Sequence, residues 1–362
     1  MADWPAAVVL AGITKSFDGF SVLRGLDLSI APGSVTALLG PSGCGKTTAL
    51  RIVAGLEDAD AGTVEIGGVV AAGPGVNVPT EQRRVGMIFQ NGALFPHLSV
   101  AHNVGYGLAR ADRKDGPRIS EMLELVGLAG FGDRRPDSLS GGQAQRVALA
   151  RALAPAPAVV LMDEPFSNLD AVLRARLRRE VGDVVRAAGV TVLLVTHDRD
   201  EAFAVADRVA VMRDGVIVQE GPPRELYLRP ADRWVAGFVG DVNFVAATVA
   251  DGVATTALGR LQVEETARGV GDVVVRPEDL VVSDGAAEAA EATVAAVVVS
   301  EEYQGAATVL EVRLGDGVML KAAVRGDARF TSGAVVGVRR RPDARPAVFP
   351  PGPRRSPPGR EE

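Results

Sequence analysis

The sequence predicts an α/β domain with a largely parallel sheet, followed by a small all-β domain. Two unbroken apolar runs, residues 158–162 and 191–195, have the length and composition of strands that are buried on both faces. A short apolar run at 34–39 leads through a glycine-rich turn into a helix-like segment that ends at Gly55. After Asn243 the chain changes to short Val-, Ala- and Gly-rich runs separated by turns. A parallel sheet covered by helices, with a separate β-domain, accounts for all three observations.

The elements of the first domain can be taken in chain order. Residues 7–30 alternate apolar and polar positions around the turn Asp18-Gly19, which predicts an antiparallel sheet edge. The runs 63–70 and 85–89 are also predicted to form strands. From Leu98 to Arg135 the apolar spacing becomes helical, which predicts a helical insert at about 92–155. The two buried strands then flank a predicted helix from about Leu169 to Ala188.

We expect three segments in all. Residues 1–240 form the α/β domain, and residues 241–341 form the β-rich domain, in which short strands run from 244 to 340. Residues 342–362 are rich in Pro and Arg with few apolar residues, which predicts disorder. The arginines of this tail could contact anionic lipid or RNA, but a solvated tail is favoured.

Length and composition limit the function classes. A chain of 362 residues exceeds the ~250 residues at which single cores stop growing, so two domains are expected. The formal net charge of −6 gives no basic footprint, and no nucleic-acid partner is expected. We find no apolar run long enough to span a bilayer and no basic segment typical of a secretory signal at the N-terminus. One cysteine excludes an intrachain disulfide and fits a reducing cytoplasm.

The glycine-rich turn is the first motif that indicates chemistry. It matches the phosphate-loop pattern G-x-x-x-x-G-K-[ST] over Gly40-Pro41-Ser42-Gly43-Cys44-Gly45-Lys46-Thr47-Thr48. Such a turn feeds a helix N-terminus and offers several backbone N–H groups to a phosphate chain. Lys46 is then expected to reach the β- and γ-phosphates, and Thr47 to offer its hydroxyl to Mg²⁺. Cys44 is interpreted as a small filler of the turn, where modification would block the nucleotide.

Two further motifs extend this interpretation. Asp163 and Glu164 follow a buried apolar strand, where Asp163 would hold the Mg²⁺ shell and Glu164 would polarise the attacking water. A third motif opens a helix and offers a second anion-binding position through a hydroxyl, free N–H groups and an amide. Its residues are Ser140, Gly141, Gly142 and Gln143.

Taken together, the motifs resemble the nucleotide-binding subunits of ATP-binding cassette (ABC) transporters over roughly residues 7–240. The resemblance is specific, because these motifs occur in the same order and spacing: Gly40 to Thr47, Leu139 to Gln143, Asp163-Glu164, Ser167-Asn168-Leu169-Asp170 and His197. It implies a P-loop NTPase fold, with an ABC ATPase core that carries an antiparallel β-subdomain and a helical insert. ATP with Mg²⁺ is the implied cofactor pair.

The resemblance also implies roles for further residues. Gln90 matches the glutamine that senses Mg²⁺ and the permease, and Asp170 lies in the loop that communicates across a dimer. His197 matches the switch histidine that contacts the γ-phosphate, which makes Glu164, His197 and Gln90 the candidate catalytic residues. Phe17 stands where relatives usually have a tyrosine that stacks on adenine, and its ring face should still stack. Ala144 replaces a glutamine found in many relatives and is expected to matter little.

The family's architecture implies partners. In these proteins the signature of one subunit faces the phosphate loop of another, so a single set of motifs implies a homodimer or a pair with a sister ATPase. A chain without membrane spans requires separate integral membrane permease subunits and, indirectly, an extracytoplasmic solute-binding protein. We expect the chain to sit peripherally on the cytoplasmic face of the membrane. Residues 90–110 resemble the permease-docking groove, where Leu94, Phe95 and Leu98 would be exposed; packing within the insert is the rival explanation.

The β-domain indicates which class of ABC ATPase the chain resembles. Arg276-Pro277-Glu278-Asp279-Leu280 resembles part of the OB-like, TOBE-type domain of ATPases from binding-protein-dependent importers. The segments 78–86 and 94–100 look most similar to ferric iron importers, while polyamine, sugar, sulfate, molybdate and thiamine importers remain alternatives. Another class, a non-transport ABC ATPase that acts as a regulatory switch, also stays open. DNA-repair and translation-type relatives fit less well, because the insert is short and the chain has one cassette.

Overall fold

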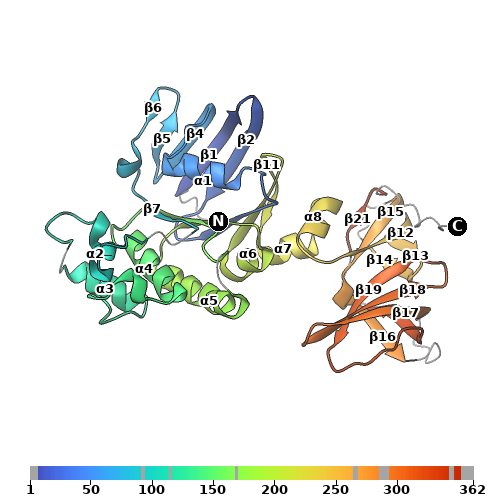
Figure 1. Cartoon of the computed structure of the whole chain (residues 1–362). Coiled ribbons are helices and arrows are strands. Elements are labelled where there is room, and N and C mark those ends of the chain that lie inside the picture. The colour runs from blue at the N-terminus through green and yellow to red at the C-terminus, as the bar shows by residue number, and fades with distance from the viewer. Residues whose placement is uncertain are drawn as a thin grey trace. The chain divides into compact units, whose positions relative to one another are not determined.

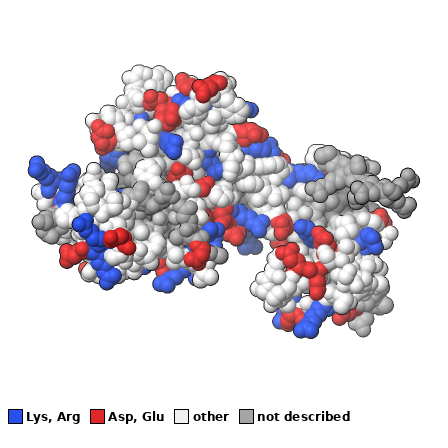
Figure 2. Space-filling model, in the orientation of Figure 1, with Lys and Arg blue, Asp and Glu red and all other residues white. Residues whose placement is uncertain are grey.

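The computed structural model describes residues 7–90, 94–113, 116–167, 170–263, 268–284, 293–341 and 346–351. Its contacts divide the chain into two compact units, Met1–Pro223 and Arg224–Glu362 (Figure 1). The domain limits expected from the sequence, 1–240 and 241–341, stay predictions. Figure 2 shows acidic and basic side chains interspersed over the visible face. No helix in the described residues is long and apolar enough to cross a membrane.

An antiparallel sheet forms the N-terminal layer of the first unit. Its strand order is β2-β1-β4-β5-β6, and the bounds are β1 Val8–Phe17, β2 Phe20–Ile30, β4 Ala61–Ile66, β5 Val69–Gly73 and β6 Val76–Asn77. Strands β1 and β2 are joined at Asp18 and Gly19, whose φ angles of 49° and 80° suit a tight hairpin. The predicted antiparallel edge at 7–30 is therefore confirmed.

The second layer is the predicted parallel sheet. Its order is β11-β10-β3-β9-β8-β7, with bounds β3 Val35–Leu39, β7 Val85–Ile88, β8 Val159–Asp163, β9 Val192–Thr196, β10 Arg208–Arg213 and β11 Val216–Gly221. All neighbours from β10 to β7 pair in parallel, and β11 is an antiparallel edge strand. Every residue of β3 and β9 is buried, as expected for strands covered on both faces.

Helices cover this sheet and build the insert. Helix α1 (Lys46–Ala54) shares one apolar core with both sheets, through Ala49, Leu50, Ile52 and Val53. The helices of the insert, which lie together in Figure 1, are α2 (Val100–Val104), α3 (Pro117–Leu125) and α4 (Gly141–Leu153). Short 3₁₀ turns occur at η1 Thr80–Gln82, η2 Gly105–Gly107 and η3 Pro136–Ser138. Helices α5 (Ala171–Ala188) and α6 (Arg199–Val205) flank β9, so the predicted helix between the two buried strands is confirmed.

The second unit is mainly β-structure. It begins with α7 (Pro223–Leu228) and α8 (Arg233–Phe238) and contains the 3₁₀ turn η4 (Pro277–Asp279). One antiparallel sheet has the order β14-β13-β12-β15-β21, with β12 Asn243–Ala250, β13 Val253–Thr256, β14 Gly259–Gln262, β15 Gly269–Val275 and β21 Val348–Phe349. The other has the order β16-β20-β17-β18-β19, with β16 Leu280–Asp284, β17 Val294–Tyr303, β18 Ala307–Leu314, β19 Met319–Arg325 and β20 Val335–Arg340. Both share one apolar core, consistent with an OB-like fold.

One sequence expectation is wrong in part. Disorder was expected throughout 342–362, but Val348 and Phe349 form β21 and pair with Val273 and Asp272 of β15. The pairing adds an edge strand to a sheet that would otherwise end at β15, and Val348 packs on the β-domain core. Residues 342–345 and 352–362 lie outside the described residues.

Candidate functional site

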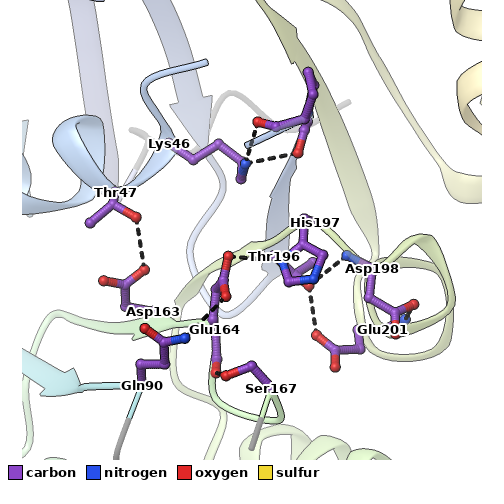
Figure 3. A network of polar contacts seen from close by, with 12 residues as sticks. Lys46, Thr47, Gln90, Asp163, Glu164, Ser167, Thr196, His197, Asp198 and Glu201 are labelled. Carbon is purple, nitrogen blue, oxygen red and sulfur yellow. Dashed lines mark hydrogen bonds and ion pairs between the residues drawn. The ribbon is translucent and has the colours of Figure 1, made fainter. Parts of the chain in front are cut away.

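Polar motifs follow the ends of neighbouring strands in the central sheet. Strand β3 leads into residues 40–45, and β9 leads into His197. Strand β8 ends at Asp163 and continues into Glu164, and β7 leads toward Gln90. Because the carboxyl ends of parallel strands meet at one edge, the sheet brings these motifs together (Figure 3). Asp163 and Glu164 were predicted to follow a buried strand, and they do so at the end of β8. The roles of the residues at this edge stay predictions.

The phosphate loop requires glycine at two positions. A Cβ atom at Gly40 would lie 2.4 Å from the carbonyl oxygen of Met212. Gly45 has φ of 104°, and a Cβ there would lie 2.7 Å from Cδ2 of Leu23. The loop therefore passes close to neighbouring atoms and turns directly into α1, whose first-turn N–H groups have no intrahelical acceptors. Such a helix N-terminus is suited to bind phosphate.

Lys46 and Thr47 open α1 on the same side. The buried Lys46 Nζ donates hydrogen bonds to the carbonyl oxygens of Gly40 (2.8 Å) and Pro41 (2.9 Å), so the ammonium lies within the curve of the loop. Thr47 Oγ1 donates to Oδ1 of Asp163 at 3.1 Å. Burial raises the pKa of Asp163; the bond from Thr47 opposes that rise, and the charge of Glu164 adds to it. Threonine and aspartate thus present adjacent oxygen atoms at the sheet edge.

Glu164 lies between two polar side chains. Gln90 Nε2 donates to Glu164 Oε2 at 3.4 Å, and Nδ1 of His197 lies 2.9 Å from Glu164 Oε1. The Glu164 backbone has φ of 43°, a left-handed conformation that is costly for a residue with a side chain. It is stabilised by bonds from Glu164 N to the Val195 carbonyl and from Ser167 Oγ to the Glu164 carbonyl. The carboxylate is thereby directed toward the end of β9.

The third motif forms a helix N-terminus. Ser140 Oγ accepts from Gln143 N at 3.3 Å, and Gln143 Oε1 accepts from Ser140 N at 2.9 Å, which is a complete capping box for α4. Gly142 is buried, and a Cβ there would lie 3.2 Å from Leu177 of α5, whereas Gly141 is exposed. In the described chain the hydrogen bonds of the Ser140 and Gln143 side chains join these two residues to each other.

Asp170 lies at another helix start. Its Oδ1 accepts from Leu173 N at 2.9 Å and caps α5. Asn168 and Leu169, which precede it in the predicted motif, lie outside the described residues, as do residues 91–93 after Gln90.

Two exposed aromatic rings lie at the β1–β2 hairpin. Phe17, the predicted stacking residue, is 41% exposed and has Lys15 Nζ 4.9 Å above its ring centre. Phe20 pairs with it across the β1–β2 hairpin and is 68% exposed. Phe20, and not Phe17, lines a cleft of about 130 Å³ together with Pro41, Ser42, Gly43 and Cys44. Phe20 was not among the residues predicted from the sequence, although a second aromatic residue beside the same hairpin turn was a usable signal.

Comparison with known proteins assigns the family. Residues 23–167 match the ABC transporter family and residues 273–345 match the TOBE domain. The Fe(3+) ions import ATP-binding protein FbpC 2 of Rhodococcus jostii is 49% identical over 341 residues, which are 92% of this chain and 96% of that protein. The chain belongs to the ABC transporter family. As an ABC ATP-binding subunit of the importer type, it is an ATPase.

Two other relatives of this ABC ATPase show the range of the likeness. FbpC of Mesorhizobium japonicum is 45% identical over 310 residues, 84% of this chain and 86% of that protein. The spermidine/putrescine import ATP-binding protein PotA of Aliivibrio fischeri is 44% identical over 289 residues, 76% of each chain. The predicted ABC fold with a C-terminal TOBE-type domain is confirmed. The roles predicted for single residues stay predictions.

Proposed function

We propose that this chain is the ATP-hydrolysing subunit of a binding-protein-dependent importer whose cargo is ferric iron. The support is the similarity to ferric iron import subunits from several organisms, at 43–49% identity over most of the chain. The observation on which hydrolysis rests is the convergence of Lys46, Asp163, Glu164 and His197 at one edge of the sheet. A binding module without turnover would not need a carboxylate between a glutamine and a histidine.

The residues at this edge have different roles in ATP binding and hydrolysis. The backbone of residues 40–48 binds the phosphates, and Lys46 leaves the loop carbonyls to contact the β- and γ-oxygens. Glu164 orients and polarises the attacking water, and His197 contacts the γ-phosphate and fixes the carboxylate. Phe17 stacks on the adenine ring, with Phe20 beside it. The support for these roles is the place of each residue in the family's motifs and the contacts described above.

The donor set suits Mg²⁺. A hydroxyl and a carboxylate lie 3.1 Å apart at Thr47 and Asp163, and the side-chain amide of Gln90 lies beside Asp163 (Figure 3). Hard oxygen donors of this kind, few in number, fit a cation that keeps several waters and binds substrate phosphates. Thr47, Gln90 and Asp163 would hold the ion. When bound, it would neutralise charge on the phosphate oxygens.

A second subunit completes the site in this proposal. Ser140, Gly141, Gly142 and Gln143 form a helix N-terminus that can take an anion, yet their hydrogen bonds lie within α4. We therefore place them against the phosphate loop of a partner, which is a homodimer mate or a sister ATPase. Asp170, at the N-terminus of α5, would lie in the loop that communicates between the two subunits across that interface. ATP binding then closes the pair, and hydrolysis reopens it.

The permease would dock on the helical insert. Leu94, Phe95 and Leu98 are half-buried rather than exposed. The Phe95 ring packs against Tyr106 in a tilted arrangement, with 4.3 Å between the ring centres. The buried Asn103 holds the Phe95 backbone through bonds to its N–H (2.8 Å) and its carbonyl (3.1 Å). Packing within the insert thus accounts for part of this pattern, while half-exposed Tyr106 and Phe89 remain for a partner. The subunit would lie on the cytoplasmic face, with a solute-binding protein acting on the permease from the other side.

Transport by the reconstituted complex tests the cargo. The chain is purified together with its permease subunits and placed in vesicles. Uptake of Fe³⁺ and of spermidine is then followed with ATP on the side of the ATPase. ATP-dependent Fe³⁺ uptake supports the proposal. Spermidine uptake alone would favour the polyamine alternative, which the PotA relative supports. ATP turnover that ignores both cargo and permease would favour a regulatory switch.

A further inference from the structure

A buried carboxylate lies behind the exposed histidine of the site. Glu201, in the first turn of α6, is 3% exposed, whereas the His197 side chain is 52% exposed. Thr196 Oγ1 donates a hydrogen bond to Glu201 Oε2 at 2.6 Å. Thr196 Oγ1 also accepts a hydrogen bond from Asp198 N at 3.0 Å (Figure 3). The two residues that flank His197 in the chain are therefore tied to each other through one hydroxyl, and that hydroxyl is anchored on Glu201.

Neighbouring groups support this anchor. Asp198 Oδ1 accepts from the N–H groups of Asp200 (2.8 Å) and Glu201 (3.3 Å), which caps α6. Arg174 of α5 lies 3.7 Å from Asp198 Oδ2 and 4.0 Å from Glu201 Oε1. The network thus joins the end of β9, the start of α6 and the helix that begins after Asp170.

The burial of the Glu201 carboxylate is energetically unfavourable unless its contacts compensate for it. Burying a carboxylate is unfavourable unless it is hydrogen-bonded or paired. Burial raises the pKa of Glu201, the bond from Thr196 opposes the rise, and Asp198 adds to it. A leucine at this position would fill a similar space without that penalty, but it could not accept the hydrogen of Thr196.

We propose that Glu201 is a positioning residue for ATP hydrolysis, which acts through Thr196 to hold the backbone of His197 so that the imidazole meets Glu164. The inference rests on the proposed roles of His197 and Glu164. A rotation of the 196–198 backbone would move Nδ1 away from a contact that is 2.9 Å long. Small displacements of a catalytic group are known to reduce turnover strongly.

The test uses the whole subunit and measures kcat, KM for ATP and thermal stability. Thr196→Val and Glu201→Leu should each lower kcat by at least about tenfold, with little change in KM, since the phosphate loop is untouched. Thr196→Ser, which keeps the hydroxyl, should restore most of the lost kcat. Asp200→Leu is the matched control, because this carboxylate is exposed on the same helix, and it should leave kcat unchanged.

The decisive measurement is made in a His197→Ala background, with excess protein and single-turnover detection. If Glu201 acts through the imidazole, Glu201→Leu should cause no further loss there; an equal loss in both backgrounds would mean a general structural role and overturn the proposal. Wild-type kcat for both Glu201→Leu and Thr196→Val would also overturn it. Unchanged hydrolysis in His197→Ala alone would instead remove the proposed role of the histidine.

Discussion

Nδ1 of His197 lies 2.9 Å from Oε1 of Glu164, and these two residues directly follow the neighbouring parallel strands β9 and β8. An ionised carboxylate only accepts hydrogen bonds, so this contact requires the hydrogen on Nδ1 and leaves Nε2 for other partners. The pair thus fixes both the direction of the carboxylate and the orientation of the ring. A water bound near Glu164 would meet a base that is already oriented.

Replacing that base should separate ATP binding from hydrolysis. Glu164→Gln keeps the shape of the side chain but cannot take a proton from water. We expect turnover to fall by about 10²- to 10⁴-fold, the usual contribution of a general base, while an ATP-bound dimer accumulates. Phosphate release and size-exclusion chromatography with ATP measure the two effects. Glu81→Gln, at an exposed position in η1, is the control, and near wild-type turnover of Glu164→Gln would contradict the assignment.

The contact between Thr47 and Asp163 leads to a prediction about the metal. Thr47→Val removes the hydroxyl and keeps the side-chain volume, so the site loses one oxygen donor. The Mg²⁺ concentration that supports half-maximal ATPase activity should rise by about tenfold or more. A Mg²⁺ titration at fixed ATP measures it, with Thr63→Val of β4 as a control outside the site. An unchanged titration would show that the hydroxyl is not a ligand.

Much of this site was predictable because its parts are encoded locally. The phosphate loop is continuous in sequence, and buried parallel strands place their following residues at one edge without further information. The strain at Glu164 and its contacts with Gln90 and His197 were not predictable, since they depend on how three loops meet.

The burial of Glu201 and the strand at Val348 and Phe349 could not be predicted from the local sequence. Glu201 lies in the charged run Arg199-Asp200-Glu201, which is typical of an exposed helix start, and only the fold buries the third residue. Val348 and Phe349 lie among prolines, so their composition favours disorder, whereas the free edge of β15 offers them hydrogen bonds. In both cases tertiary contacts outweigh the local signal.

Cys44 should resist alkylation in the folded protein. It is the single cysteine of the chain and is buried in the phosphate loop. Burial raises the pKa of its thiol, although the nearby Lys46 opposes the rise, so little reactive thiolate forms at neutral pH. Mass spectrometry after iodoacetamide treatment at pH 7.5 should show much slower modification of the native chain than of the urea-denatured chain. Equal rates would mean that the loop opens readily.

The buried Glu201 also predicts a pH dependence of stability. Its folded-state pKa is raised above the ordinary value of 4.5, so the folded chain holds this proton more tightly than the unfolded chain. Its contribution is therefore most favourable below 4.5 and is lost as the pH rises through the raised pKa. Since Glu201→Gln does not titrate, the free energy of unfolding of wild type relative to this variant should fall as the pH rises above 4.5. Urea denaturation of both proteins measures it, and a pH-independent difference would contradict it.

Arg83 supports the phosphate-loop helix from its far end. The guanidinium is buried and donates to the carbonyl oxygens of Ile52 (2.7 Å), Val53 (3.2 Å) and Val78 (2.7 Å). Arg83→Met would leave the last carbonyls of α1 without these donors in a buried place, so we expect a loss of about 3 kcal/mol in the free energy of unfolding. Arg84→Met, at the exposed neighbouring position, should change it by less than about 0.5 kcal/mol. Denaturant titrations of both variants decide the point, and equal stabilities would show that α1 does not depend on this arginine.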